Sequence, residues 1–256
     1  MGIVQTKISR QYFFLNGDLL LHSISTNSKN GNGLQTEIEK WLNNSYCFKD
    51  TIHQKKGNPE RAGYSADSVN KQLRLKMREH ITGIHGESFV EYGSIVSVSK
   101  KGFDFCIYDE EYYTKKIRNA FIGNPGQYNG DEKLEKIHAK IKKSNDKCFS
   151  ADEWKKKIQE IRGTPGENLD ICKKSYTVAG EIQMGNWAMI RHDFIRLLNS
   201  ERDGEIDFYI YITPDGNLKS MLSDQIVSYE KAKEFFCQNI RLVHTPIWLI
   251  GIDLAT

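Results

Sequence analysis

The chain has 256 residues and a formal net charge of +3, with 39% hydrophobic and 11% aromatic residues. A chain of this size buries roughly 75% of the surface that its unfolded form exposes, so it can build a full core without disulfide or metal staples. The aromatic content and small net charge exclude a mainly disordered chain, and no apolar run reaches the roughly 20 residues of a membrane-spanning helix.

The cysteines predict a reduced protein. They are odd in number and widely spaced, and no two form a CxxC pair: Cys47, Cys106, Cys148, Cys172 and Cys237. This pattern argues against a disulfide framework or a structural zinc site and favours reduced thiols in a cytoplasm. The first ten residues lack the apolar segment of a secretory signal. We therefore expect a cytoplasmic protein that is not bound to a membrane.

The first third of the chain predicts short strands and two helices. Apolar runs at 12–14 and 19–21 indicate one or two strands, and turn-rich loops are expected at 25–33 and 55–60. The helices are predicted over 34–42 and 66–81. The second helix is expected because apolar residues recur every four positions, at Val69, Leu73, Met77 and Ile81.

The middle of the chain predicts a hairpin and then two helices. Residues 89–98 and 103–108 are rich in β-branched and aromatic side chains, and the turn 99–102 separates them. A break at 124–130 precedes the helices expected over 132–143 and 152–161. Ser150, with Glu153 three residues later, resembles a capping box.

The last ninety residues are the most regular. They predict strands at 169–172, 178–183, 205–212 and 246–253, with helices at 187–199 and 228–237. This order indicates an α/β fold in which helices flank a mixed sheet.

Three polar residues in this region suggest a metal site. Asp170 lies in an expected strand, and Glu181 and Gln183 point to one face because they are two residues apart on a strand. Carboxylate and amide oxygens of this kind hold Mg²⁺, which seeks substrate phosphates. The spacing alone is equally compatible with two strand-end carboxylates and an exposed glutamine that have no catalytic role.

Two segments carry an excess of positive charge. Residues 53–80 contain seven Lys or Arg against three acids, and residues 131–157 contain nine lysines against six acids. Both segments suit contact with phosphates, although a solvated helix face gives the same pattern. Neither GxxxxGK[ST] nor GxGxxG occurs in the chain, so we expect no nucleotide cofactor.

The stretch 169–254 resembles the type II restriction endonucleases of the BamHI, BglII and BstYI group, within the PD-(D/E)xK nuclease superfamily. The resemblance rests on Glu-X-Gln at 181–183, Gly-Asn at 185–186, a helix of matching length and Gly-Glu-Ile-Asp at 204–207. It implies a restriction-endonuclease-like core with N-terminal additions. We expect residues 151–256 to form the catalytic core, with the metal site, the dimer helix and the recognition loop. Residues 1–150 are expected to form the N-terminal part of the fold, with extra DNA-binding or dimerisation elements.

The resemblance implies roles for the polar residues. Asp170 and Glu181 match the two metal-binding carboxylates, and Gln183 takes a place that is Lys in most of the superfamily. An amide cannot act as a general base near neutral pH, so Gln183 is expected to orient the attacking water or to bind metal. A further acidic ligand is expected from a preceding helix. Glu153 is the nearest candidate, and Glu160 and Glu167 compete with it.

Base contacts are also implied. Asn186 matches a base-contacting position, and Asp224 with Gln225 falls where the resembling enzyme reads its outer G·C pair with Asp-Arg. Arginine suits guanine and glutamine suits adenine. We therefore expect a GATC-centred palindrome whose outer pair is of the A·T type. Helix capping by Asn186 and an ordinary turn at 224–225 are the structural alternatives.

A homodimer is expected, since a two-fold dimer reads a palindrome. In the resembling enzymes the helix over 187–199 builds the dimer interface, so Arg191, His192, Asp193 and Arg196 are expected to face a partner. We also expect an arm around Arg74, Lys76 and Arg78 that clamps DNA or closes the dimer.

These observations predict an Mg²⁺-dependent, site-specific endonuclease acting on double-stranded DNA. Two alternatives stay open at this point. One is a DNA-binding protein that keeps the scaffold without cutting, and the other is a repair nuclease that recognises DNA structure.

Overall fold

The computed structural model describes residues 3–26, 33–53, 60–91, 93–97, 102–124, 130–143, 150–202 and 206–255. The chain divides into two compact units. The first unit comprises Met1–Thr82, Gly180–Leu198 and Phe208–Thr256, and the second comprises Gly83–Ala179 and Asn199–Asp207. Residue 150, expected as a domain boundary, therefore lies inside the second unit.

The first unit contains a mixed sheet. Strand β1 (Ile3–Phe14) pairs antiparallel with β2 (Ser45–Cys47) and with β10 (Ile247–Leu254), and β10 pairs parallel with β9 (Phe208–Pro214). Next to β9 lies β8 (Val178–Ile182). All of β9 and most of β10 are buried apolar runs, which is typical of central strands.

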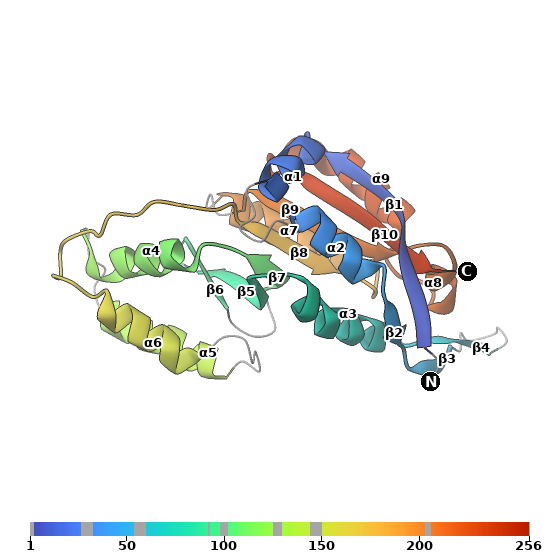
Figure 1. The fold of residues 1–256 in the computed structure, drawn as a ribbon, viewed down its shortest axis with the longest axis horizontal. Helices are drawn as coiled ribbons and strands as arrows, with labels where there is room; N and C mark the ends of the chain where they lie inside the picture. Colours follow the sequence, from blue (N-terminus) through green and yellow to red (C-terminus); the bar gives the residue numbers. More distant parts are fainter. Residues whose placement is uncertain are drawn as a thin grey trace. The chain divides into compact units, whose positions relative to one another are not determined.

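Helices cover this sheet (Figure 1). Helices α1 (Gly17–Thr26) and α2 (Leu34–Leu42) pack against β1, and α9 (Tyr229–Asn239) packs against β9 and β10. The remaining helical elements of this part of the chain are α3 (Ala66–His80), α7 (Met189–Arg202), α8 (Gly216–Met221) and the 3-10 turn η1 (Ile240–Leu242). A separate hairpin joins β3 (Asp50–His53) to β4 (Arg61–Tyr64), and β4 contacts α8.

The second unit has its own strands and core. Strand β5 (Ile84–Glu91) pairs antiparallel with β6 (Ser94–Ser97) and β7 (Phe103–Ile107). Helices α4 (Glu110–Ile122), α5 (Gly130–Lys142) and α6 (Ala151–Glu160) pack together (Figure 1). Their buried face includes Phe121, Ile137 and Trp154.

Most of the expected elements are confirmed, including the α/β class and the mixed sheet. The α2 bounds agree at both ends, and α3 buries Val69, Leu73 and Met77 as its four-residue spacing predicts. The Ser150 hydroxyl accepts a hydrogen bond from the Glu153 N–H and caps α6. The loops expected at 25–33, 55–60, 99–102 and 124–130 lie mostly outside the described residues.

Two expectations about elements in the first half of the chain are wrong, and one helix there was not expected. Leu19–Leu21 belongs to α1 rather than to a strand, and the alternation of exposed Leu19 with buried Leu21 does not distinguish the two. The chain turns at Gly93, whose φ is +68°, so β6 pairs with β5 and not with β7. Helix α4 was not expected, because its apolar positions are interrupted by charged ones.

Within the described part, no helix is long and apolar enough to cross a membrane.

Helix α3 offers a direct test of this packing. Leu73 is fully buried and Leu75 is 51% exposed on the same helix. Leu73→Ala should lower the free energy of unfolding by about 2–5 kcal/mol because it leaves a cavity. Leu75→Ala is the matched control and should change it by less than about 0.5 kcal/mol. Urea denaturation measures both, and equal losses would contradict the orientation of α3.

Candidate active site

Strand β8 delivers Glu181 into the interior of the first unit. All five residues of β8 are buried, and the Glu181 side chain is only 6% exposed. Gln183 follows the end of the strand, where its N–H donates to the Ile212 carbonyl of β9 at 2.8 Å. Because side chains two residues apart share a face, both Glu181 and Gln183 reach toward α7.

Two charged residues of helix α7, Asp193 and Arg196, lie one turn apart and contact these two side chains. The Arg196 guanidinium forms an ion pair with the Glu181 carboxylate. The Gln183 Nε2 donates to Asp193 Oδ2 at 3.1 Å. Arg196 Nη1 lies 3.6 Å from Asp193 Oδ1, so one guanidinium serves two carboxylates.

Strand β9 completes this cluster with Tyr211. Its hydroxyl donates to Asp193 Oδ2 at 2.9 Å. Burial raises the pKa of Asp193, although hydrogen bonds from Gln183 and Tyr211 oppose the rise. Burial also raises the pKa of the Tyr211 hydroxyl well above its ordinary value, with the Asp193 charge adding to the effect.

Arg196 remains the cation of the cluster. Burial acts to lower the pKa of its guanidinium, but the negative charges of Glu181 and Asp193 outweigh burial and the net shift is upward. With both carboxylates ionised, the three side chains carry one net negative charge. A buried excess of negative charge favours the uptake of a cation or a proton.

Asp170 lies in the second unit, in a segment that is not a strand. The expected strand over 169–172 is wrong, because Asn119 of α4 takes the place of a neighbouring strand. Its side-chain oxygen accepts from the Leu169 N–H at 2.9 Å, and its amide donates to the Leu169 carbonyl at 2.8 Å. Asp170 itself is exposed.

A buried arginine holds the chain that leads to Asp170. Arg118 of α4 is fully buried and donates to the carbonyls of Arg162, Thr164 and Glu167. Burial lowers the pKa of its guanidinium. The segment before Asp170 is therefore fixed by side-chain hydrogen bonds to α4 rather than by a strand ladder.

The other proposed metal ligands are exposed residues of the second unit. Glu153 lies in the first turn of α6, and Glu160 and Glu167 lie on the surface. Among the residues that the structure describes, no group of three or more His, Cys, Asp or Glu side chains is arranged to hold a metal ion. The metal-binding roles of Asp170, Glu181 and Glu153 therefore stay predictions.

The two segments expected to read bases lie side by side. Asn186 forms an isolated antiparallel bridge with Ile226. The Trp187 N–H donates to the Gln225 carbonyl at 2.8 Å, and the Val227 N–H donates to the Gly185 carbonyl at 2.9 Å. The side chains of residues 186, 224 and 225 are exposed. The fold therefore presents both segments on one surface of the first unit.

Local geometry gives each of these segments a structural role as well. The Asn186 Oδ1 accepts from the Ala188 N–H at 2.9 Å, a turn that leads into α7. Gln225 has a φ of +68°, a left-handed conformation that costs free energy in a residue with a side chain. Such strain is often found at binding loops.

A groove of about 730 Å³ borders the loop that contains Asp224 and Gln225. Arg61 of β4 lines this groove, donates to the Leu222 carbonyl and lies 3.8 Å from Asp224. The hairpin can approach the backbone of Met221 this closely because residue 63 is a glycine. A Cβ at that position would lie 2.1 Å from the Met221 carbonyl oxygen. Sequence reasoning missed Arg61, since nothing in its surroundings indicates contact with a residue 163 positions away.

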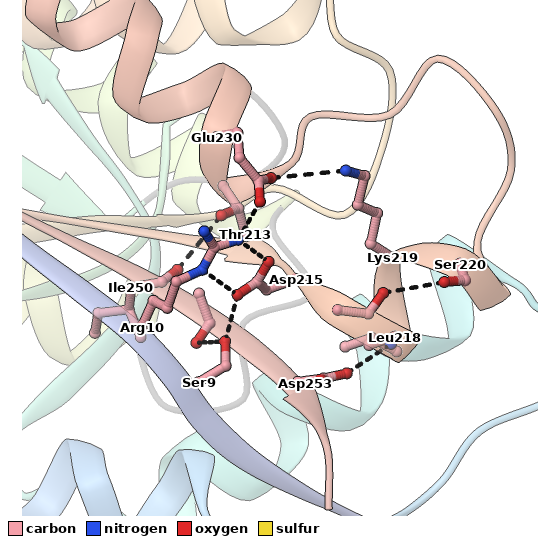
Figure 2. A network of polar contacts seen from close by, with 12 residues as sticks. Ser9, Arg10, Thr213, Asp215, Leu218, Lys219, Ser220, Glu230, Ile250 and Asp253 are labelled. Atoms are coloured by element: carbon pink, nitrogen blue, oxygen red, sulfur yellow. Dashed lines mark hydrogen bonds and ion pairs between the residues drawn. The ribbon is translucent and has the colours of Figure 1, made fainter.

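An ion-pair network forms another wall of the groove (Figure 2). Arg10 of β1 binds the carboxylates of Asp215 and Glu230, and Lys219 lies 3.6 Å from Glu230. Burial acts to raise the pKa of Asp215, but hydrogen bonds from Arg10 and Ser9 give a net lowering. This network fixes α8 and α9 on either side of the loop 222–225.

The proposed interface and arm residues have different environments. Arg191 and His192 are exposed on α7, whereas Arg196 pairs with Glu181 of its own chain. Asp193 is 2% exposed, so the expectation that it faces a partner is wrong. Asp193 lies three residues after Ile190 and four before Leu197, both fully buried, so its helical spacing was the signal that it shares their face.

On α3, Arg78 is exposed and Arg74 is half-buried. Lys76 donates to Asn44 at 3.0 Å and lies over the Tyr46 ring. Contact of these three residues with DNA stays a prediction.

Replacing Arg196 tests how much its ion pairs with the buried carboxylates stabilise the folded protein. Arg196→Met leaves Glu181 and Asp193 without their cation and should lower the free energy of unfolding by about 3–5 kcal/mol. Arg191→Met, on the exposed face of the same helix, is the control and should change it by less than about 0.5 kcal/mol. Thermal and urea unfolding at neutral pH measure both variants. A small effect of Arg196→Met would argue against the shared ion pair.

One family of known proteins matches the sequence of this chain. A crystal structure of restriction endonuclease BglII complexed with a DNA 16-mer aligns with 98% of this chain and 78% of that chain, at 11% identity and a TM-score of 0.49. Comparison with curated protein sequences gave no significant match. The profile of the restriction endonuclease BglII/BglIII family matches residues 111–252, which is more than half of the chain. The chain therefore belongs to the restriction endonuclease BglII/BglIII family, whose members are phosphodiester hydrolases.

Proposed function

We propose that this protein is an Mg²⁺-dependent endonuclease that cuts double-stranded DNA at a short palindrome. The observation that carries the proposal is the placement of Glu181 and Gln183 on one face, where they contact Arg196 and Asp193 of α7. Family membership supports the same chemistry. The products would be a 5′-phosphate and a 3′-hydroxyl.

Two residues of the first unit offer oxygen ligands of the kind that a hard divalent cation takes. Glu181 and Gln183 offer carboxylate and amide oxygens, and Mg²⁺ typically takes one or two protein carboxylates and fills its remaining positions with water and phosphate oxygens. The resemblance to the restriction endonucleases implies that Asp170 and Glu153, which lie in the second unit, also bind metal. Bound Mg²⁺ supplies stabilisation of phosphate charge and activation of the attacking water.

The chain's own residues set the remaining requirements. Gln183 has no accessible proton equilibrium, so its task is to orient a water or a ligand through its carbonyl oxygen. Glu181 holds its charge inside the protein because Arg196 accompanies it. None of these groups needs to act as a strong base.

Sequence recognition would lie in the paired loops. Asn186 and Gln225 suit adenine, which favours a GATC-centred site with an outer A·T pair. The exposed Arg191 and His192 on α7 would face the second copy in a two-fold dimer, consistent with a palindrome. The basic side chains of α3 at Arg74, Lys76 and Arg78 would contact phosphates.

Digestion of supercoiled plasmid DNA tests the reaction. We expect Mg²⁺-dependent cleavage at defined positions, and Glu181→Ala and Asp170→Ala should each lower the rate by at least about 100-fold, since each removes charge that holds the metal. Glu234→Ala, an exposed residue of α9, is the control and should cut normally. DNA that migrates more slowly in a gel with the protein but is not cut would identify a non-cleaving DNA-binding protein instead. A preference for branched DNA over plasmid would identify a structure-selective nuclease.

A panel of six-base duplexes with a GATC centre tests recognition. We expect the outer A·T duplex to be cut best, by a margin equivalent to about 1–3 kcal/mol, because one good bidentate contact discriminates by that amount. Gln225→Arg should shift the preference toward an outer G·C pair. A preference of the unmodified protein for GGATCC would end this assignment.

A further inference from the structure

The side-chain amide of Gln183 is held at both ends. Its Oε1 accepts from the Gly185 N–H at 3.0 Å, and its Nε2 donates to Asp193 Oδ2 at 3.1 Å. A backbone N–H can only donate and an ionised carboxylate can only accept. Rotating the amide by half a turn would therefore place donor against donor and acceptor against acceptor.

The acceptor is itself fixed. Asp193 is 2% exposed, receives the Tyr211 hydroxyl at 2.9 Å and has Arg196 at 3.6 Å. Tyr211 is fully buried in β9. A buried carboxylate held by a hydrogen bond from β9 and an ion pair on α7 is a rigid reference point for the side chain that binds it.

We propose that Asp193 is a positioning residue that sets the orientation of the Gln183 amide. The nitrogen is drawn to Asp193, so the carbonyl oxygen is turned away from it. Only this end of the amide can bind a cation or accept a hydrogen bond from a water. The inference rests on the proposed function, because the orientation matters to catalysis only if Gln183 acts on metal or water.

A reciprocal exchange tests the pairing. Asp193→Asn provides an amide that can donate toward Gln183 and releases it to turn. Gln183→Glu sets two carboxylates against each other. The double variant restores one amide against one carboxylate with the roles exchanged. We expect each single variant to slow Mg²⁺-dependent plasmid cleavage by about tenfold or more, and the double variant to recover to within about threefold of the unmodified rate.

Asp18→Asn is the matched control, because it makes the same chemical change at an exposed residue of α1 that is not part of the candidate site. Cleavage by this variant should stay within about threefold of the unmodified protein. A loss in Asp18→Asn as large as that in Asp193→Asn would mean that the exchange acts through general destabilisation and would overturn the proposal, and so would additive losses in the double variant. If Asp193→Asn does not fold, folding of the double variant supports the pairing. Failure of both to fold, with Gln183→Glu folded, contradicts it.

A second readout does not depend on nuclease activity. In ¹H–¹⁵N spectra, the Gln183 side-chain amide is identified as the pair of resonances that disappears in Gln183→Glu. We expect Asp193→Asn to displace this pair and Asp18→Asn to leave it nearly unchanged. An undisplaced pair in Asp193→Asn would refute the positioning role. If the unmodified protein does not cut DNA, the proposed function fails while this spectrum still decides the orientation.

Discussion

The interaction on which the candidate site depends is the sharing of one guanidinium by two buried carboxylates. Glu181 comes from β8 and Asp193 from α7, and Arg196 contacts the first and lies 3.6 Å from the second. Burying an unpaired carboxylate costs several kcal/mol, so neither acid can stay charged in this interior alone. The ion pair therefore joins helix to strand, and it keeps negative charge next to Gln183 without exposing it to water.

This arrangement changes how the departure from the superfamily pattern is understood. The resemblance places Gln183 where a lysine is usual, which would leave the strand without a cation. Here the positive charge comes from the neighbouring helix instead, through Arg196. An arginine is always protonated and cannot serve as a general base. In the proposed reaction the cluster would balance charge and orient groups, and the proton chemistry would come from water.

The sequence predicted the parts that depend on local pattern. Period and composition gave α2, α3, α6 and the buried strands β8 and β10, and the spacing of Glu181 and Gln183 gave their common face. The sequence could not predict contacts that one side chain makes with a residue far away in the chain. Asn119 replaces a strand neighbour of Leu169, Arg196 turns inward to Glu181, and Arg61 reaches the loop 222–225. Such contacts depend on how elements meet in space, which no periodicity encodes.

The candidate site and the loops proposed to read DNA are joined through a single residue. The Gly185 N–H holds the Gln183 carbonyl oxygen, and the Gly185 carbonyl accepts the Val227 N–H from the loop that carries Gln225. A movement of that loop would therefore reach the Gln183 amide through two hydrogen bonds and the backbone of Gly185 between them. Specific endonucleases need recognition to precede cutting, and a rigid connection this short lets correct base contacts and correct amide orientation depend on the same backbone position.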